Sequence, residues 1–101
     1  DAVKATISAM EKSSTEPKIY HIGNDEEEIL IKDLLDKIIN LSNFKPKEII
    51  YEEAPQGSPA RRCPDIGFSK NDFGFSPNIS LMKGLELTFE WYQSMHPEGN
   101  I

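Results

Sequence analysis

The loop Arg61-Arg62-Cys63-Pro64-Asp65 holds the side chains best suited to chemistry in this 101-residue chain. Two adjacent guanidinium groups can match phosphate or carboxylate oxygens in bidentate geometry. Pro55, Pro59 and Pro64 stiffen the surrounding segment, which lowers the entropy lost when the arginines are held in place. From the residues alone, anion binding and a surface salt bridge are equally good interpretations of the arginine pair.

Two further residues of this loop carry functional groups. Asp65, three residues after Arg62, is an acceptor suited either to a sugar hydroxyl or to neutralising the arginine. Cys63 follows two cations that favour its thiolate. A thiol packed under the loop is the favoured interpretation of Cys63, and a redox or nucleophilic site is the alternative. The sequence offers no catalytic residue.

Other catalytic patterns are absent from the sequence. It contains no G-x-G-x-x-G turn, P-loop, H-E-x-x-H helix or pair of cysteines at zinc spacing. His21 and His96 fall in a predicted strand and at a helix end, where structural or solvated roles are favoured. The acidic run 25–28 is interpreted as a solvated helix start, because its carboxylates are adjacent instead of convergent. We therefore expect no metal site.

Composition narrows the class of protein. The chain carries 11 Lys+Arg against 17 Asp+Glu and a formal charge of -6, which argues against a nucleic-acid surface. A single cysteine fits a reducing compartment. No stretch approaches the about 20 apolar residues of a membrane span, and no signal peptide is visible. We expect a cytoplasmic protein with no membrane partner and, because the sequence opens at Asp1, a processed or truncated product.

Hydrophobic periodicity predicts the elements that would position the loop. Apolar residues at helical spacing predict helices at 2–12, where Asp1 would be the cap, at 25–42, and at 81–95, where Ser80 would be the cap. A short helical turn is predicted at 69–73, ending at Gly74. Segments 18–22 and 48–52 are rich in β-favouring residues and predict strands. The predicted fold class is α/β: a small mixed α+β domain with one core, in which helices pack on a small sheet.

Six short segments in this order resemble the C-terminal part of the NAD-dependent nucleotide-sugar epimerase/dehydratase family, the extended short-chain dehydrogenases. They are Ile19-Tyr20-His21-Ile22-Gly23-Asn24, Ile31-Lys32-Asp33-Leu34-Leu35, Arg61-Arg62-Cys63-Pro64-Asp65-Ile66, Phe73-Gly74-Phe75-Ser76-Pro77, Ser80-Leu81-Met82-Lys83-Gly84-Leu85 and Phe89-Glu90-Trp91-Tyr92. The resemblance covers essentially the whole chain, and it implies that residues 1–101 are a single substrate-binding lobe.

The resemblance also implies what this chain lacks. Members of the family carry an N-terminal Rossmann domain with a G-x-x-G-x-x-G loop and a catalytic Tyr-x-x-x-Lys pair, and neither occurs here. NAD is therefore implied for a full-length parent and not for this chain. The implied partners are a nucleotide-sugar, UDP- or dTDP-linked, and the Rossmann domain of the same parent. This chain alone is expected to be inactive.

The family pattern carries over onto three residues of the loop. Arg62 corresponds to the arginine that holds the nucleotide's pyrophosphate, and Asp65 to the acceptor that faces the ribose or supports that arginine. Arg61 is implied as an assisting residue. Gly23-Asn24 corresponds to a structural strand end. Leu30 departs from the pattern, since relatives have Ser or Thr at this helix cap.

Two functions follow as alternatives. In the first, this lobe positions the nucleotide diphosphate for a parent epimerase, dehydratase or decarboxylase of carbohydrate metabolism, an isomerase or lyase. In the second, the chain is a stand-alone, non-catalytic binding or protein-interaction module derived from that fold. The surface left exposed in the second case should drive self-association into a homo-oligomer.

Overall fold

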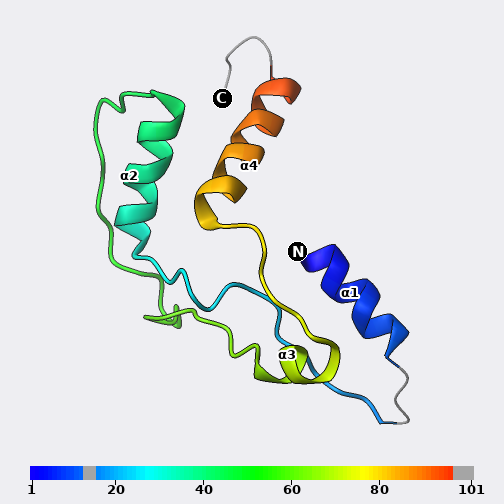
Figure 1. The fold of residues 1–101 in the computed structure, drawn as a ribbon. Helices are drawn as coiled ribbons and strands as arrows, with labels where there is room; N and C mark the ends of the chain where they lie inside the picture. Colours follow the sequence, from blue (N-terminus) through cyan, green and yellow to red (C-terminus); the bar gives the residue numbers. More distant parts are fainter. Residues whose placement is uncertain (13–15, 97–101) are drawn as a thin grey trace. The chain divides into compact units, whose positions relative to one another are not determined.

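The computed structural model describes residues 1–12 and 16–96. These residues contain four helices, which are α1 (Ala2–Glu11), α2 (Ile31–Ser42), α3 (Gly67–Phe73) and α4 (Leu81–Met95) (Figure 1). The chain divides into two compact units. Unit 1 is formed by Asp1–Glu28 and Pro59–Ile79, with α1 and α3, and unit 2 by Ile29–Ser58 and the described part of Ser80–Ile101, with α2 and α4.

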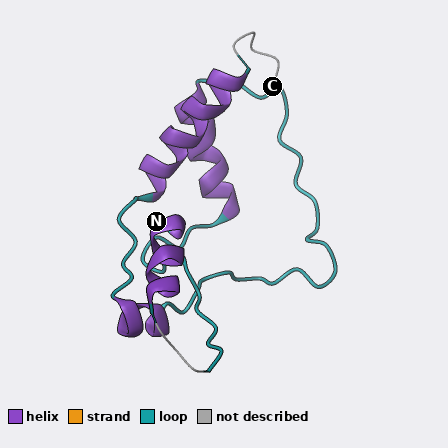
Figure 2. Cartoon of the chain, turned by 90° about the vertical axis from the view of Figure 1, so that its right-hand side faces the viewer, coloured by secondary structure: helices purple, strands orange, loops and turns teal. Residues whose placement is uncertain are grey.

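The predicted α/β fold class is wrong, because the described residues form helices and loops and no strand (Figure 2). Segments 18–22 and 48–52, both predicted as strands, lie in different units. Neither one makes a backbone hydrogen bond to another segment in the described ranges. A strand needs such a ladder, and residues with high β-propensity do not provide one without a partner. The described part of the chain is all-helical.

Helix α2 begins later than predicted. The acidic run 25–28 precedes the helix instead of forming its first turn, and α2 starts at Ile31. Asn24 accounts for the difference, because its side chain accepts the amide of Glu26 at 2.9 Å and donates to Glu27 at 2.7 Å. Such local side-chain bonds compete with a helical backbone. Leu30 occupies the cap without a side-chain hydrogen bond, at the position where the family resemblance placed the cap.

Helix α1 ends at Glu11, one residue before the predicted end, and Asp1 does not cap it through its side chain. Instead, Asp1 Oδ2 accepts the backbone amides of Asn78 at 3.1 Å and Ile79 at 2.9 Å. The carboxylate thus joins the start of α1 to the segment that follows α3. This contact lies within unit 1.

Helix α4 has the predicted span, and α3 ends where predicted although it begins two residues earlier, at Gly67. Helix α3 ends at Gly74, which adopts the left-handed conformation with φ 69 that glycine tolerates best. Ser80 caps α4, and its hydroxyl accepts the amide of Lys83 at 3.2 Å. None of the four helices described has the length and apolar character needed to cross a membrane.

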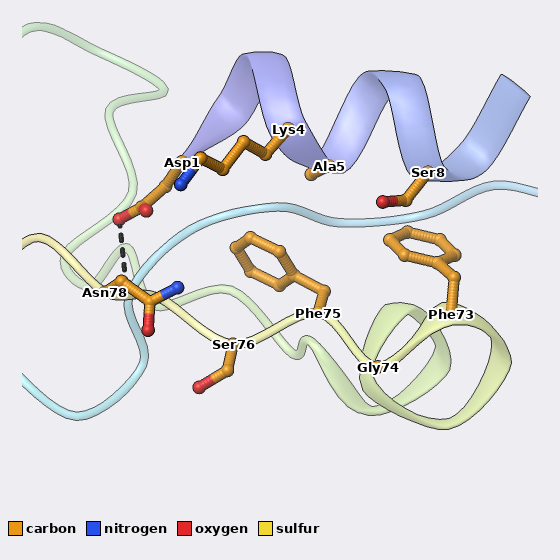
Figure 3. A pocket seen from close by; sticks show the side chains of 9 residues that line it. All are labelled: Asp1, Lys4, Ala5, Ser8, Phe73, Gly74, Phe75, Ser76 and Asn78. Carbon is orange, nitrogen blue, oxygen red and sulfur yellow. Dashed lines mark hydrogen bonds between the residues drawn. The ribbon is translucent and has the colours of Figure 1, made fainter.

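The core of unit 1 is small and built around α1 and α3. Ala5, Ile66 and Phe75 are buried, and Ile22 and Phe73 pack against them. Figure 3 shows the rings of Phe73 and Phe75 directed toward the face of α1 that carries Ala5. These contacts place the segment around Ile22 and the loop before α3 on the same core.

Unit 2 consists mainly of α2 packed along α4. The apolar residues at the centre of each helix are half-buried, among them Leu34, Leu35, Leu85 and Phe89. No described residue of unit 2 is fully buried. The three binding residues predicted from the sequence, Arg61, Arg62 and Asp65, all belong to unit 1.

Candidate functional site

An open groove in unit 1 is formed by residues 20–24 on one side and residues 62–65 on the other. Its volume is about 810 Å³. Of the three binding residues predicted from the sequence, Arg62 and Asp65 line the groove and Arg61 does not. The structure therefore brings two of the three candidates to one surface, together with the Gly23-Asn24 turn.

Two contacts hold the sides of the groove together. A Cβ atom built on Gly23 would lie 2.7 Å from Cγ of Pro64, so only glycine allows the proline ring to come this close. The thiol of Cys63 approaches the carbonyl oxygen of Asp25 at 3.8 Å, a weak hydrogen bond. Cys63 is half-buried.

Helix α3 supports the groove through Ser69, whose side chain is completely buried. Its hydroxyl lies 3.0 Å from the carbonyl oxygen of His21 and 2.9 Å from that of Ile66. One hydroxyl proton serves these two acceptors, of which His21 lies on one side of the groove and Ile66 directly follows the other side. Ser69 thus joins residue 21 to the loop that precedes α3.

A second link between α3 and the groove is made by Asp72. Its Oδ2 atom accepts hydrogen bonds from Tyr20 Oη at 2.7 Å and from Lys18 Nζ at 2.9 Å. The ring of Tyr20 also packs edge-to-face on Phe73, with centroids 5.0 Å apart. These contacts fix Tyr20 where it enters the groove.

Hydrogen bonding shifts the pKa values of these groups. The hydrogen bond from Tyr20, followed by that from Lys18, lowers the pKa of Asp72 below its usual 3.8. The hydrogen bond to Asp72 raises the pKa of Tyr20 above its usual 10.0 and that of Lys18 above its usual 10.5. All three groups are therefore in their hydrogen-bonding forms across the neutral range.

Arg62 stands in the groove with an exposed guanidinium. Within the described residues it forms neither a hydrogen bond nor an ion pair. Asp65 also belongs to the groove, and its Oδ1 accepts the amide of Gly67 at 2.9 Å, which helps to start α3. No described contact joins Asp65 to Arg62. The side chain that matches phosphate best is thus the one with the most freedom to bind.

Arg61 is engaged elsewhere. Its Nε donates to Glu28 Oε1 at 2.5 Å and its Nη2 donates to Glu28 Oε2 at 2.7 Å, a bidentate pair. The hydrogen bond from Arg61 lowers the pKa of Glu28 below its usual 4.5, and the same bond raises the pKa of Arg61. Glu28 was not singled out in the sequence, where it belongs to an undifferentiated acidic run.

Of the two histidines considered in the sequence, His21 belongs to the groove and His96 to unit 2. His96 is the exposed C-cap residue of α4. The imidazole of His21 is exposed, and only its backbone carbonyl has a described contact. Across the described ranges no three His, Cys, Asp or Glu side chains are grouped to hold a metal ion. A smaller hollow of about 140 Å³ lies between α1 and residues 73–78 (Figure 3).

Two curated proteins are similar to this chain. One is a UDP-N-acetyl-alpha-D-glucosaminuronate decarboxylase of Bacillus cytotoxicus, 31% identical over 101 residues, which are 94% of this chain and 30% of that protein. The other is a putative GDP-L-fucose synthase of Arabidopsis thaliana, 32% identical over 65 residues, 64% of this chain and 19% of that protein. The chain therefore spans less than a third of either relative. No family model and no solved structure matches. Both relatives support the resemblance to the nucleotide-sugar epimerase/dehydratase family, over a small part of their length.

Proposed function

We propose that the groove between residues 20–24 and 62–65 binds the diphosphate of a nucleotide-sugar, with Arg62 as the principal contact. The observation that carries this proposal is the guanidinium of Arg62, which lines an open groove without a described partner of its own. A free guanidinium fork donates parallel hydrogen bonds to phosphate oxygens, and such charge-assisted bonds are the strongest that a side chain offers.

Asp65 provides a hydrogen-bond acceptor in the groove for the hydroxyl groups of such a ligand. One oxygen of Asp65 is used by the amide of Gly67, and Oδ2 has no described partner. That oxygen can accept a ribose or sugar hydroxyl. The names of the two relatives contain a UDP-linked and a GDP-linked sugar, which supports a nucleoside diphosphate sugar as the ligand class without fixing the base.

The redox cofactor is assigned to another part of a longer parent. The described residues do not fit a dinucleotide, since they contain no strand that leads over a glycine-rich turn into a helix N-terminus. The proposed parent is an NAD-dependent epimerase, dehydratase or decarboxylase, and a Rossmann domain of that parent is the proposed partner of this chain. The role proposed for residues 1–101 is to hold and orient the diphosphate.

A titration of the 101-residue chain with UDP and GDP tests the proposal, with binding followed by NMR shifts of residues 20–24 and 62–65. We expect weak binding, because one part of a site leaves much of the ligand in water. Arg62→Ala should weaken it about tenfold, the loss of one charge-assisted interaction. Lys47→Ala is the matched control, because Lys47 is an exposed cation of unit 2. Equal affinities of the two variants would refute the role of Arg62.

A second candidate function is a non-catalytic interaction module, and one feature of α1 favours it. Val3, Ile7 and Met10 lie one helical turn apart and are exposed at 73%, 51% and 79%. An apolar stripe of this kind is typical of a protein interface. Sedimentation over a range of concentrations tests self-association through this stripe. A chain that stays monomeric at high concentration would argue against it.

A further inference from the structure

We infer that Glu28 is a positioning residue for the groove: by holding Arg61 it fixes the loop so that the next residue, Arg62, faces the ligand. This inference rests on the proposed function of the groove. It assigns different roles to two adjacent arginines, one as an anchor and the other as the ligand contact.

The loop before Arg61 explains why an anchor is needed. Every residue from 51 to 60 is exposed. The one backbone hydrogen bond described within this stretch joins the amide of Ser58 to the carbonyl of Pro55 at 2.9 Å, which is internal to the stretch. Arg61 directly follows this stretch, and its side chain contacts Glu28, which lies 33 positions earlier in the sequence.

The geometry of the anchor suits this role. Two parallel hydrogen bonds fix both the position and the plane of the Arg61 guanidinium, which a single contact would not do. These hydrogen bonds hold Arg61, the residue directly before Arg62. On the other side of Arg62, the contact of Pro64 with Gly23 holds the chain. Arg62 is thus held from both sides while its own side chain stays free, which reduces the ordering cost of binding.

A stabilising role alone does not account for the pair. The side chains of Arg61 and Glu28 are 73% and 37% exposed, so solvent screens even this bidentate pair and limits its contribution to the free energy of unfolding. A carboxylate near an anion site also repels the ligand unless a cation neutralises it. Arg61 provides that neutralisation, so Glu28 can anchor the loop at little electrostatic cost to the groove.

Electrostatics and positioning predict opposite results for Glu28→Gln. Removal of a negative charge near the groove should by itself strengthen UDP binding. Loss of the anchor should weaken UDP binding, and we expect a weakening of about threefold to tenfold, the size of an ordinary hydrogen bond, because the effect on Arg62 is indirect. Glu26→Gln is the matched control, since it removes the same charge two positions away, and the Glu26 carboxylate has no partner among the described residues. We expect this control to bind UDP as well as the unmodified chain or better.

A charge-swapped variant separates positioning from a general structural effect. Glu28→Arg combined with Arg61→Glu restores an ion pair at the same two positions with the same net charge. We expect it to recover most of the affinity lost in Glu28→Gln, while the urea midpoints of all four proteins stay together. UDP affinity of Glu28→Gln equal to or higher than that of Glu26→Gln would overturn the inference.

The alkylation rate of Cys63 tests the positioning role of Glu28 without any ligand, so the result does not depend on the proposed function. Cys63 is two residues from Arg61 in the same loop and is half-buried. Alkylation by neutral iodoacetamide should be severalfold faster in Glu28→Gln than in Glu26→Gln and should return toward the original rate in the charge-swapped variant. If the unmodified chain fails to bind UDP or GDP, the proposed function fails, and these rates still decide whether Glu28 positions the loop. Equal rates in the two glutamine variants would overturn the positioning role.

Discussion

Pro64 lies against the backbone of Gly23 so closely that a Cβ atom on residue 23 would come within 2.7 Å of its ring. Gly23 does not have the left-handed backbone conformation that favours glycine, which Gly57 and Gly74 have. The proline ring is therefore what requires glycine at position 23. This contact sets the spacing between the two sides of the groove.

Gly23→Ala should destabilise the chain by about 1–3 kcal/mol, the usual cost of overpacking. Urea unfolding followed by tyrosine fluorescence measures this loss. In a Pro64→Ala background the cost should disappear, because the Cβ of residue 64 lies at an ordinary 3.5 Å from the new methyl group. A cost that persists in the double variant would show that the proline ring is not its cause.

Ser69→Ala should cost about 1 kcal/mol, because it removes the donor described for the carbonyl of His21, whereas the carbonyl of Ile66 keeps the amide of Lys70. The free energy of unfolding in urea measures the effect. Ser76→Ala is the matched control, since Ser76 is exposed and should change stability by less than about 0.5 kcal/mol. Similar losses in both variants would mean that the hydrogen bonds of Ser69 are not responsible.

The Asp72 cluster predicts how stability depends on pH. The pKa of Asp72 is lowered in the folded chain, so its contribution is complete above the usual 3.8 and is lost as pH falls through the lower folded value. The pKa of Tyr20 is raised, so its contribution is complete below 10.0 and is lost as pH rises through the folded value. Urea midpoints measured from acid to alkaline pH should therefore fall at both ends.

Tyr20→Phe tests the acid side of that cluster directly. It removes the hydroxyl bonded to Asp72 and keeps the ring that packs on Phe73. We expect the pKa of Asp72, followed by its carboxyl carbon shift, to rise toward 3.8. An unchanged titration of Asp72 would contradict the assigned cause of its shift.

Ser80→Ala should weaken the start of α4 by about 1 kcal/mol, the typical value of an N-cap. Ser80→Asp keeps an acceptor for the amide of Lys83 and should retain most of that stability. Amide hydrogen exchange at the first turn of α4 reports the difference. Exchange that is equally fast in both variants would mean that the cap contributes nothing.

Local signals predicted the helices well. Helix α4 follows from Ser80 and the apolar stripe behind it, and the end of α3 follows from Gly74, because each of these features acts within one or two turns. The start of α2 was missed, since Asn24 forms a local turn that competes with the helix. The strands at 18–22 and 48–52 were predicted wrongly for a different reason: pairing is a property of two segments, and one β-prone segment does not reveal whether its partner is present.

In the candidate site, too, local features were predictable from the sequence and contacts between distant segments were not. Arg62 and Asp65 share a groove, as the spacing within one loop allowed us to expect. The pairing of Arg61 with Glu28 joins residues 33 positions apart, and nothing in the sequence distinguishes Glu28 from its three acidic neighbours. The contact of Gly23 with Pro64 is equally non-local. Residue types predicted which groups could bind an anion, and only the folded chain showed which of them is free.

The discontinuity of unit 1 has a consequence for how the chain is made. Its core joins Ala5 and Ile22 to Ile66 and Phe75, and Asp1 contacts Asn78, 77 positions away. A ribosome releases α1 long before it has synthesised the residues that bury it. Helix α1 has 10 residues, fewer than the about 12–15 that an isolated helix needs to be stable. Helix α1 is therefore synthesised before α3 but becomes stable only after it, and until residue 79 emerges the nascent chain exposes the apolar side chains of the unit 1 core.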